Sequence, residues 1–257
     1  MSRRRNDSRA RLLEHLKELR LPAMRTQFGE LAETARREGM GYEEYLLALC
    51  EAESQVRREH RVGRLLRASR LPVEKNLESL DLGRFGRSTG LQVRTLLEGG
   101  FLDRRENVLA FGKPGSGKTH LLCAVGQELV HAGRSIYFTT CCRLVQELLR
   151  AKQELRLDKQ IRRLAKFEGI IVDDIGYVEQ DRGEMEVLFT LLAERYERGS
   201  ILLTSNLAFS KWERIFKDPM TTAAAIDRLV HHSVIIELNI DSYRMEAAKR
   251  KKKDGGQ

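Results

Sequence analysis

The sequence predicts an α/β fold in which helices flank a parallel sheet, preceded by a small all-α domain. After about residue 72, short β-rich runs alternate with helical segments, a pattern typical of a parallel sheet covered on both faces. Before that point apolar residues recur at helical spacing, as at Leu12, Leu16 and Leu19, with almost no glycine. We therefore expect a helical domain over residues 1–72, the α/β domain over residues 73–245 and a basic disordered tail over residues 246–257.

The helical domain is predicted to hold three helices. The first carries the leucines named above, the second covers Met24 to Arg37 and ends near Gly39, and the third starts around Tyr42. Pro72 ends the third helix because a proline disfavours helical geometry in the residue before it. In the α/β domain we expect strands at residues 108–111, 135–139, 169–172, 201–204 and 234–238.

Charge and composition restrict the possible functions. The 257 residues contain 46 Lys and Arg against 37 Asp and Glu, a formal charge of +9. This excess suggests an anionic partner such as nucleic acid, although a solvated basic surface gives the same balance. The four cysteines show no CxxC pair and no zinc-ligand spacing. The sequence has no signal-peptide pattern and no run long enough to span a membrane, so we expect a cytoplasmic protein without a membrane partner.

The third predicted helix is strongly basic along one face. Its arginines recur at steps of three and four residues, which places several guanidinium groups on one side of a helix. Such a face can lie along a DNA backbone, but it can also be solvated and partly neutralised by neighbouring glutamates such as Glu51, Glu53 and Glu59. The candidate DNA-binding residues are Arg57, Arg58, Arg61, Arg64 and Arg67, with Arg70 next in the series.

A glycine-rich phosphate-binding loop follows the first predicted strand. The segment GKPGSGKT matches GxxxxGK[ST] at every fixed position and lies between a strand and a helix, as a P-loop requires. We expect Lys118 to reach the β- and γ-phosphates of ATP and Thr119 to bind Mg²⁺ through its hydroxyl. The predicted nucleotide-binding residues are Gly112, Lys113, Pro114, Gly115, Ser116, Gly117, Lys118, Thr119 and His120.

Two further strand ends supply polar side chains to the same edge of the sheet. Asp173 and Asp174 end the apolar run GIIVDDIG, where Asp173 would hold Mg²⁺ with Thr119 and Asp174 would orient or deprotonate the attacking water. The strand ILLTSN finishes in Asn206, which could contact the γ-phosphate or that water. A helix cap or a turn is the alternative explanation for the paired acids, and a plain turn is the alternative for the end of ILLTSN.

The order GKPGSGKTH, IIVDDIG, LLTSN and AAAIDRLVHHS closely resembles the AAA+ ATPases of the IstB and DnaC group, and the helical leader resembles the IstB side. The resemblance implies that Asn206 is the sensor 1 residue and that Arg228 is an arginine finger acting on a neighbouring subunit's ATP, which requires a homo-oligomer. It also places Arg244 near a position compared with sensor 2. The sequence departs from larger AAA+ proteins because too few residues follow Leu238 to build the full C-terminal lid.

Three functions follow from these motifs. The first is an ATPase that oligomerises on double-stranded DNA and helps a cognate transposase to select and use target DNA. The second is a DnaC-like loader of a replicative helicase that touches single-stranded DNA. The third is a metabolic P-loop kinase, which the basic leader and the short C-terminal part disfavour. A shorter carboxylate at Asp174, where many AAA+ proteins carry glutamate, leads us to expect slow hydrolysis.

Overall fold

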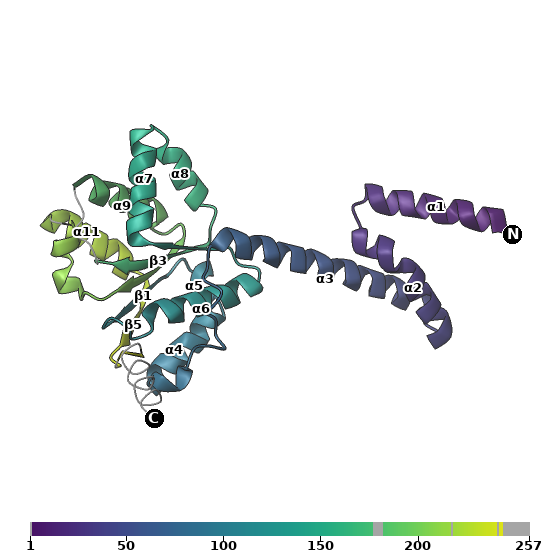
Figure 1. Cartoon of the computed structure of the whole chain (residues 1–257), viewed down its shortest axis with the longest axis horizontal. Helices are drawn as coiled ribbons and strands as arrows, with labels where there is room; N and C mark the ends of the chain where they lie inside the picture. The colour runs from purple at the N-terminus through teal and green to yellow at the C-terminus, as the bar shows by residue number, and fades with distance from the viewer. Residues whose placement is uncertain (1, 177–181, 217, 241, 244–257) are drawn as a thin grey trace, which may run out of the picture. The chain divides into compact units, whose positions relative to one another are not determined.

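The computed structural model describes residues 2–176, 182–216, 218–240 and 242–243. The chain divides into two compact units, residues 1–64 and residues 65–257, and the division falls inside one long helix. Figure 1 shows the helices and strands of both units. The predicted tail over residues 246–257, the candidate Arg244 and the question of a C-terminal lid lie outside the described residues. None of the described helices is both long and apolar enough to cross a membrane.

The first unit is helical, as predicted. It contains α1 (Ser2–Glu18), α2 (Pro22–Glu38) and most of α3 (Tyr42–Ser69). Pro22 begins α2, where its missing N–H would have no helical partner anyway. Gly39 ends α2 with a φ of 69°, a conformation that costs glycine little. Helix α3 ends three residues before Pro72, as expected from the restriction that proline imposes on the preceding backbone.

A buried carboxylate in α3 holds the beginning of α2. Glu53 is 4% exposed, and its Oε2 atom accepts hydrogen bonds from the backbone N–H groups of Ala23 at 2.9 Å and Met24 at 3.2 Å. Arg57 donates to the Oε1 atom of Glu53 at 3.0 Å and to the carbonyl of Arg20 at 2.8 Å. Desolvation by itself would raise the pKa of Glu53, but the hydrogen bonds from Arg57 and from the backbone outweigh it and lower the pKa.

The second unit is built on the predicted parallel sheet. Its strand order is β2-β3-β4-β1-β5, and every neighbouring pair is parallel. Each strand matches its prediction within a few residues. The strands are β1 (Asn107–Gly112), β2 (Ile136–Thr140), β3 (Gly169–Ile175), β4 (Ser200–Ser205) and β5 (Ser233–Leu238).

Helices cover both faces of this sheet, which confirms the predicted α/β architecture. One face carries α7 (Cys141–Gln153), α8 (Leu157–Leu164), α9 (Arg182–Arg195) and α11 (Pro219–Val230), and the other carries α4 (Arg87–Leu97), α5 (Gly100–Asp103) and α6 (Lys118–His131) (Figure 1). Short helices connect some of these elements: η1 (Leu82–Arg84), η2 (Phe209–Lys211) and α10 (Glu213–Phe216).

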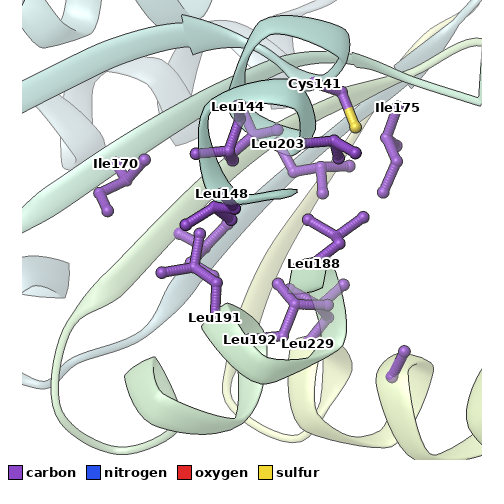
Figure 2. Packing of buried hydrophobic residues seen from close by; sticks show 14 of the residues in the cluster. Cys141, Leu144, Leu148, Ile170, Ile175, Leu188, Leu191, Leu192, Leu203 and Leu229 are labelled. Atoms are coloured by element: carbon purple, nitrogen blue, oxygen red, sulfur yellow. The ribbon is translucent and has the colours of Figure 1, made fainter. Parts of the chain in front are cut away.

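The core consists of two apolar layers, one on each face of the sheet, because successive side chains along a strand point to opposite faces. In β4, Leu203 packs against the α7 and α9 side while its neighbour Leu202 packs against the α6 side. Figure 2 shows the first layer, where Leu144 and Leu148 of α7 meet Leu188 and the residues around it in α9. Burial of each such leucine side chain contributes roughly 1.5–3 kcal/mol to the stability of the folded state. The carboxyl ends of the strands are therefore held rigidly.

The amino edge of the sheet is fixed by one buried amide. The Oδ1 atom of Asn107 accepts from the backbone of Ile201 at 2.9 Å, and its Nδ2 atom donates to the carbonyls of Leu229 at 3.1 Å and Arg228 at 3.3 Å. Asn107 thus joins the start of β1, the start of β4 and the last turn of α11. The end of α11 consequently lies at the edge of the sheet opposite to the glycine-rich loop.

Candidate nucleotide-binding site

The glycine-rich loop joins β1 to α6 at the carboxyl edge of the sheet. Gly115 and Gly117 adopt φ values of 82° and 92°, which side chains other than glycine rarely allow. Gly117 is the N-cap of α6 and makes no side-chain cap hydrogen bond. The first N–H groups of α6 therefore remain available to an anion, and the positive end of the helix dipole favours a phosphate there.

A cavity of about 540 Å³ opens above this loop. Its size falls within the range of small-molecule and cofactor sites. Of the predicted residues, Gly112 and Lys113 are not in its wall, and Asp173 lies beneath it. The lining residues are Lys75, Ser79, Leu80, Asp81, Arg84, Phe85, Pro114, Gly115, Ser116, Gly117, Lys118, Thr119, His120, Asp174, Asn206, Ile240 and Tyr243.

Lys118 is held in place by the loop that it follows. Its Nζ atom donates to the carbonyls of Gly112 at 2.8 Å and Lys113 at 3.0 Å, and the residue is only 5% exposed. A buried ammonium group is costly unless it is hydrogen-bonded, so these contacts stabilise the curled loop and the charge together. The ammonium therefore lies at the floor of the cavity, where phosphate oxygens would meet it.

Ser116 adds an unsatisfied polar group to the loop. The residue is 1% exposed, and its Oγ atom has no hydrogen-bond partner among the described residues. A buried hydroxyl without a partner costs free energy of about 1–3 kcal/mol, which a ligand oxygen can recover. Together with Lys118, this hydroxyl fits a polyphosphate in the cavity.

Three oxygen-bearing side chains meet at the end of β3. Asp173 is 6% exposed, and its Oδ1 atom accepts from the hydroxyls of Thr119 and Thr204, each at 2.7 Å. Thr119 is on α6 and Thr204 is on β4, so the carboxylate joins three elements. Carboxylate and hydroxyl oxygens are ligands that Mg²⁺ accepts, so the pair Thr119 and Asp173 fits a magnesium ion bound to phosphates.

Asp174 turns out of the sheet toward the cavity. Its φ of 60° lies in the left-handed region, and the pairing of β3 with β4 shifts register between Val172 and Ile175. The backbone N–H of Asp174 donates to the Oγ1 atom of Thr204 at 2.8 Å, which holds this turn. A residue kept in a rare conformation at a site edge is consistent with a functional role. The exposed carboxylate of Asp174 lines the cavity, whereas that of Asp173 points into the protein.

Asn206 reaches the same cavity from the end of β4. The residue directly follows Ser205, the last residue of that strand, and lines the cavity beside Asp174. Its Oδ1 atom is buried and has no hydrogen-bond partner among the described residues. An amide oxygen in this state can accept a hydrogen bond from water, and an amide N–H can donate one to phosphate.

One wall of the cavity was not predicted from the sequence. Leu80, Phe85, Ile240 and Tyr243 supply apolar surface, and no motif marked them. Hydrogen bonds hold part of this wall along α6: His120 contacts the hydroxyl of Ser79 at 3.1 Å, and other bonds link the Pro72 to Asn76 segment to α6. Ile240 and Tyr243 follow β5, whose carboxyl end lies beside the glycine-rich loop, and this is the one available signal. Leu80 and Phe85 are separated from β1 by α4 and α5, so nothing in the sequence marks their position.

The segment after β5 closes over the glycine-rich loop. The backbone N–H of Tyr243 donates to the carbonyl of Gly115 at 3.0 Å, and Ser242 occupies the space that a side chain at Gly115 would need. The guanidinium carbon of Arg84 lies 5.2 Å from the centroid of the Tyr243 ring. Arg84 and Tyr243 line the cavity here, and an aromatic ring of this kind can stack on a nucleobase.

Arg228 does not line the cavity of its own chain. It lies in the last turn of α11, where its guanidinium carbon is 4.7 Å from the centroid of the Phe189 ring and its Nη1 atom donates to Ala224. The bonds of Asn107 place it at the amino edge of the sheet. Arg228 is therefore placed away from the nucleotide cavity of its own chain.

The candidate DNA-binding arginines differ in their surroundings. Arg57 is used within the first unit, by Glu53 and the carbonyl of Arg20. Arg70 pairs with Glu147 at 3.2 Å and lies over the ring of Tyr137. The remaining members of the series are exposed on α3, and they are Arg58, Arg61, Arg64 and Arg67.

Comparison with known proteins agrees with this geometry. A family model described as IstB-like ATP-binding protein matches residues 14–252. A putative insertion sequence ATP-binding protein of Sinorhizobium fredii is 42% identical over 96% of this chain and 83% of its own length. The putative ATP-binding protein of insertion sequence IS21 from Pseudomonas aeruginosa is 37% identical over 93% of this chain and 89% of its own length.

Solved structures share the fold of the second unit. AMPPCP-bound DnaA from Aquifex aeolicus superposes with a TM-score of 0.57 at 20% identity, over 72% of this chain and just over half (57%) of that chain. The DnaC helicase loader superposes with a TM-score of 0.54 at 18% identity, over 65% of this chain and 98% of that chain. These likenesses show the AAA+ fold that the motif order predicts.

Proposed function

Since this chain belongs to the family of IstB-like ATP-binding proteins, we propose that it is an ATP-dependent, DNA-binding regulator of insertion-sequence transposition. In this proposal it oligomerises on duplex DNA and helps a transposase to select and use target DNA. The observation that carries the proposal is the cavity, which Lys118 and Thr119 line and beside which Asp173 bonds to Thr119, because these residues fit a magnesium-bound polyphosphate. The names of its relatives, insertion sequence ATP-binding proteins, supply the biological setting.

The proposed chemistry is hydrolysis of ATP to ADP and phosphate. Lys118 and Ser116 bind phosphate oxygens, and Thr119 and Asp173 hold Mg²⁺, which neutralises charge on the phosphates. Asn206 and Asp174 position a water molecule for in-line attack on the γ-phosphorus. As the new bond to water forms, the bond from the γ-phosphorus to the ADP oxygen breaks, and the proton of the water passes to the Asp174 carboxylate.

Assembly would complete the site through Arg228. A planar guanidinium from a neighbouring subunit can stabilise charge that spreads over the transferred phosphoryl group. The location of Arg228 at the opposite edge of the sheet supports a role in trans over one in cis. To act, its side chain must leave the Phe189 ring, so hydrolysis would depend on contact between subunits.

DNA binding is assigned to the exposed arginines of α3. Arg58, Arg61, Arg64 and Arg67 are exposed, and guanidinium groups bind the phosphates of a DNA backbone, which are the same for every sequence. Binding should therefore depend strongly on salt and little on sequence. Arg57 is the exception in the predicted set, because its removal would also disturb the Glu53 contact that holds α2.

The test is assembly of the full chain on a long DNA duplex, followed by sedimentation and electron microscopy with and without ATP and Mg²⁺. The wild-type protein should form nucleotide-dependent oligomers on duplex DNA, and Lys118→Ala should not. Lys159→Ala is the control, because it removes an exposed lysine of α8 that is absent from the cavity wall. Assembly that survives Lys118→Ala unchanged would contradict the proposed coupling.

The same assay separates the other functions. Strict preference for single-stranded DNA, with no oligomer on duplex, would favour a helicase loader. A stable monomer that transfers phosphate to a small acceptor would favour a kinase and contradict both assembly functions. Addition of the transposase encoded by the same insertion sequence tests the remaining claim, because ATP-bound oligomers on DNA should retain it and the Lys118→Ala protein should not.

A further inference from the structure

A cluster of three potential metal ligands lies far from the cavity, at the amino edge of the sheet. Glu197 is in the turn between α9 and β4, and His231 and His232 join α11 to β5. One ligand atom from each side chain can be chosen so that all three lie within 4.8 Å of one another, and all three residues are exposed. We propose that Glu197, His231 and His232 bind a divalent transition-metal ion of the zinc class.

The backbone holds the three residues at this edge. The carbonyl of Glu197 accepts from the Nη1 atom of Arg105 at 2.6 Å, and Glu197 has a φ of 56°. The carbonyl of His232 accepts from the backbone N–H of Asn107 at 2.7 Å. The spacing of the cluster is therefore set by the start of β1 and by the loop before it, and it does not depend on loose side chains alone.

The orientation of His231 suits metal binding. Its Nδ1 atom lies 3.0 Å from the hydroxyl oxygen of Tyr196, which leaves the Nε2 atom for an ion. A histidine that binds a metal usually engages a second polar group through its other ring nitrogen, and this contact fixes the ring. The ring of His232 lies beside that of His231, with 4.1 Å between the two centroids.

The ligand set indicates the class of ion. Two imidazoles and one carboxylate form a known zinc set that leaves a fourth position for water or another ligand. Tetrahedral zinc places its ligand atoms roughly 3.4 Å apart, so rotation of these exposed side chains is enough to close the cluster. Hard ions such as Mg²⁺ prefer oxygen ligands, which separates this cluster from the Thr119 and Asp173 pair. The inference does not rest on the proposed function.

The test is calorimetric titration of the nucleotide-free full chain with Zn²⁺ in millimolar Mg²⁺. We expect one Zn²⁺ per chain with a Kd tighter than about 10 µM. His232→Ala and Glu197→Gln should each weaken binding by about 10-fold or more. His131→Ala removes an exposed histidine at the end of α6 and should change nothing. Cys142→Ser removes an exposed thiol, which is another possible zinc ligand, and should also change nothing.

Circular dichroism checks that each variant is folded, and Glu197→Gln keeps the size of its side chain. Absence of binding by the wild-type protein would overturn the proposal. So would unchanged affinity in both His232→Ala and Glu197→Gln, and so would loss of binding in Cys142→Ser alone.

Discussion

The hydroxyl of Thr204 bonds to both acidic residues of the candidate site. It donates to the Oδ1 atom of Asp173 at 2.7 Å and accepts from the backbone N–H of Asp174 at 2.8 Å. Thr204 is fully buried, so these bonds have no competition from solvent. Thr204 therefore sets the direction of the buried Asp173 carboxylate and holds the turn that presents the exposed Asp174 carboxylate.

Thr204→Val should uncouple nucleotide binding from hydrolysis. The valine keeps the branched shape but removes both hydrogen bonds, so Asp173 keeps only its Thr119 donor and Asp174 loses its anchor. We expect the rate of ATP hydrolysis to fall about 10- to 100-fold while ATP affinity changes little. Steady-state phosphate release and fluorescent-nucleotide titration measure the two quantities.

Thr204→Ser is the matched control, because it retains the hydroxyl. It should recover most of the hydrolysis rate. Equal losses in the serine and valine variants would show that the site needs the methyl group of Thr204 as much as its hydroxyl, and would contradict the hydrogen bonds as the sole cause.

Arg228→Ala should retain ATP binding and lose hydrolysis. Because Arg228 lies away from its own cavity, the affinity of each subunit for ATP should stay within about 3-fold of the wild type, while turnover falls by about 10³-fold. Arg198→Ala, which removes an exposed arginine paired with Glu194, is the control and should behave as wild type.

A mixing experiment tests whether this effect is in trans. Lys118→Ala subunits lack a working cavity but keep Arg228, and Arg228→Ala subunits have the reverse defect. Their mixture should regain part of the hydrolysis that neither protein shows alone. Failure to regain any hydrolysis, despite mixed oligomers detected by sedimentation, would count against Arg228 as an arginine finger.

Glu53→Ala should loosen the start of α2. The substitution removes the acceptor for one buried and one partly buried N–H group and should cost about 1–3 kcal/mol locally. Because the pKa of Glu53 is lowered in the folded protein, its contribution is complete above its ordinary value of 4.5 and is lost as the pH falls through the lower folded-state pKa.

Amide hydrogen exchange across α2 measures this change. Exchange should be faster in Glu53→Ala than in wild type at neutral pH, and the difference should shrink in acid. Glu51→Ala alters an exposed residue of the same helix and should leave exchange as it is. A difference that grows as the pH falls would contradict the assignment.

The four cysteines should react unequally with an alkylating reagent. Burial raises the pKa of Cys123 to about 12, and Cys123 and Cys141 are both shielded from solvent. Cys50 and Cys142 are exposed and should be modified first, because the reagent reaches them without any opening of the fold. Mass spectrometry of the native protein should find these two sites labelled, and early labelling of Cys123 would be inconsistent with the fold.

The glycine-rich loop and the end of β3 could be predicted because their chemistry is local. GKPGSGKT and the paired acids are contiguous in the chain, and the strand and helix around each motif follow from apolar periodicity. Sheet topology alone then brings them to one edge. The fold could be predicted for the same reason, since alternation of short strands and helices determines a parallel sheet.

The cavity wall and the role of Thr204 could not be predicted in this way. Phe85 and Tyr243 are 158 residues apart, and their approach depends on tertiary packing that no spacing reveals. In the sequence, Thr204 is only a hydroxyl residue in an apolar strand. The register of β3 and β4 is what places it beside Asp173. Arg57 shows a limit of predictions from charge patterns. The spacing of the arginines does not distinguish an arginine that is open to DNA from one that is bonded to Glu53.

The opposite locations of the glycine-rich loop and Arg228 constrain the symmetry of any assembly that joins them. The two lie at the two ends of β1, which spans six residues or roughly 17 Å of strand. In a dimer related by a two-fold axis, a single surface of each subunit would have to contain both the glycine-rich loop and Arg228, which lie at opposite edges of the sheet. Subunits joined through these groups must instead stack head to tail, each with the same polarity. Such a stack either closes into a ring or grows as a helical filament, and a filament could follow the helical path of a DNA duplex.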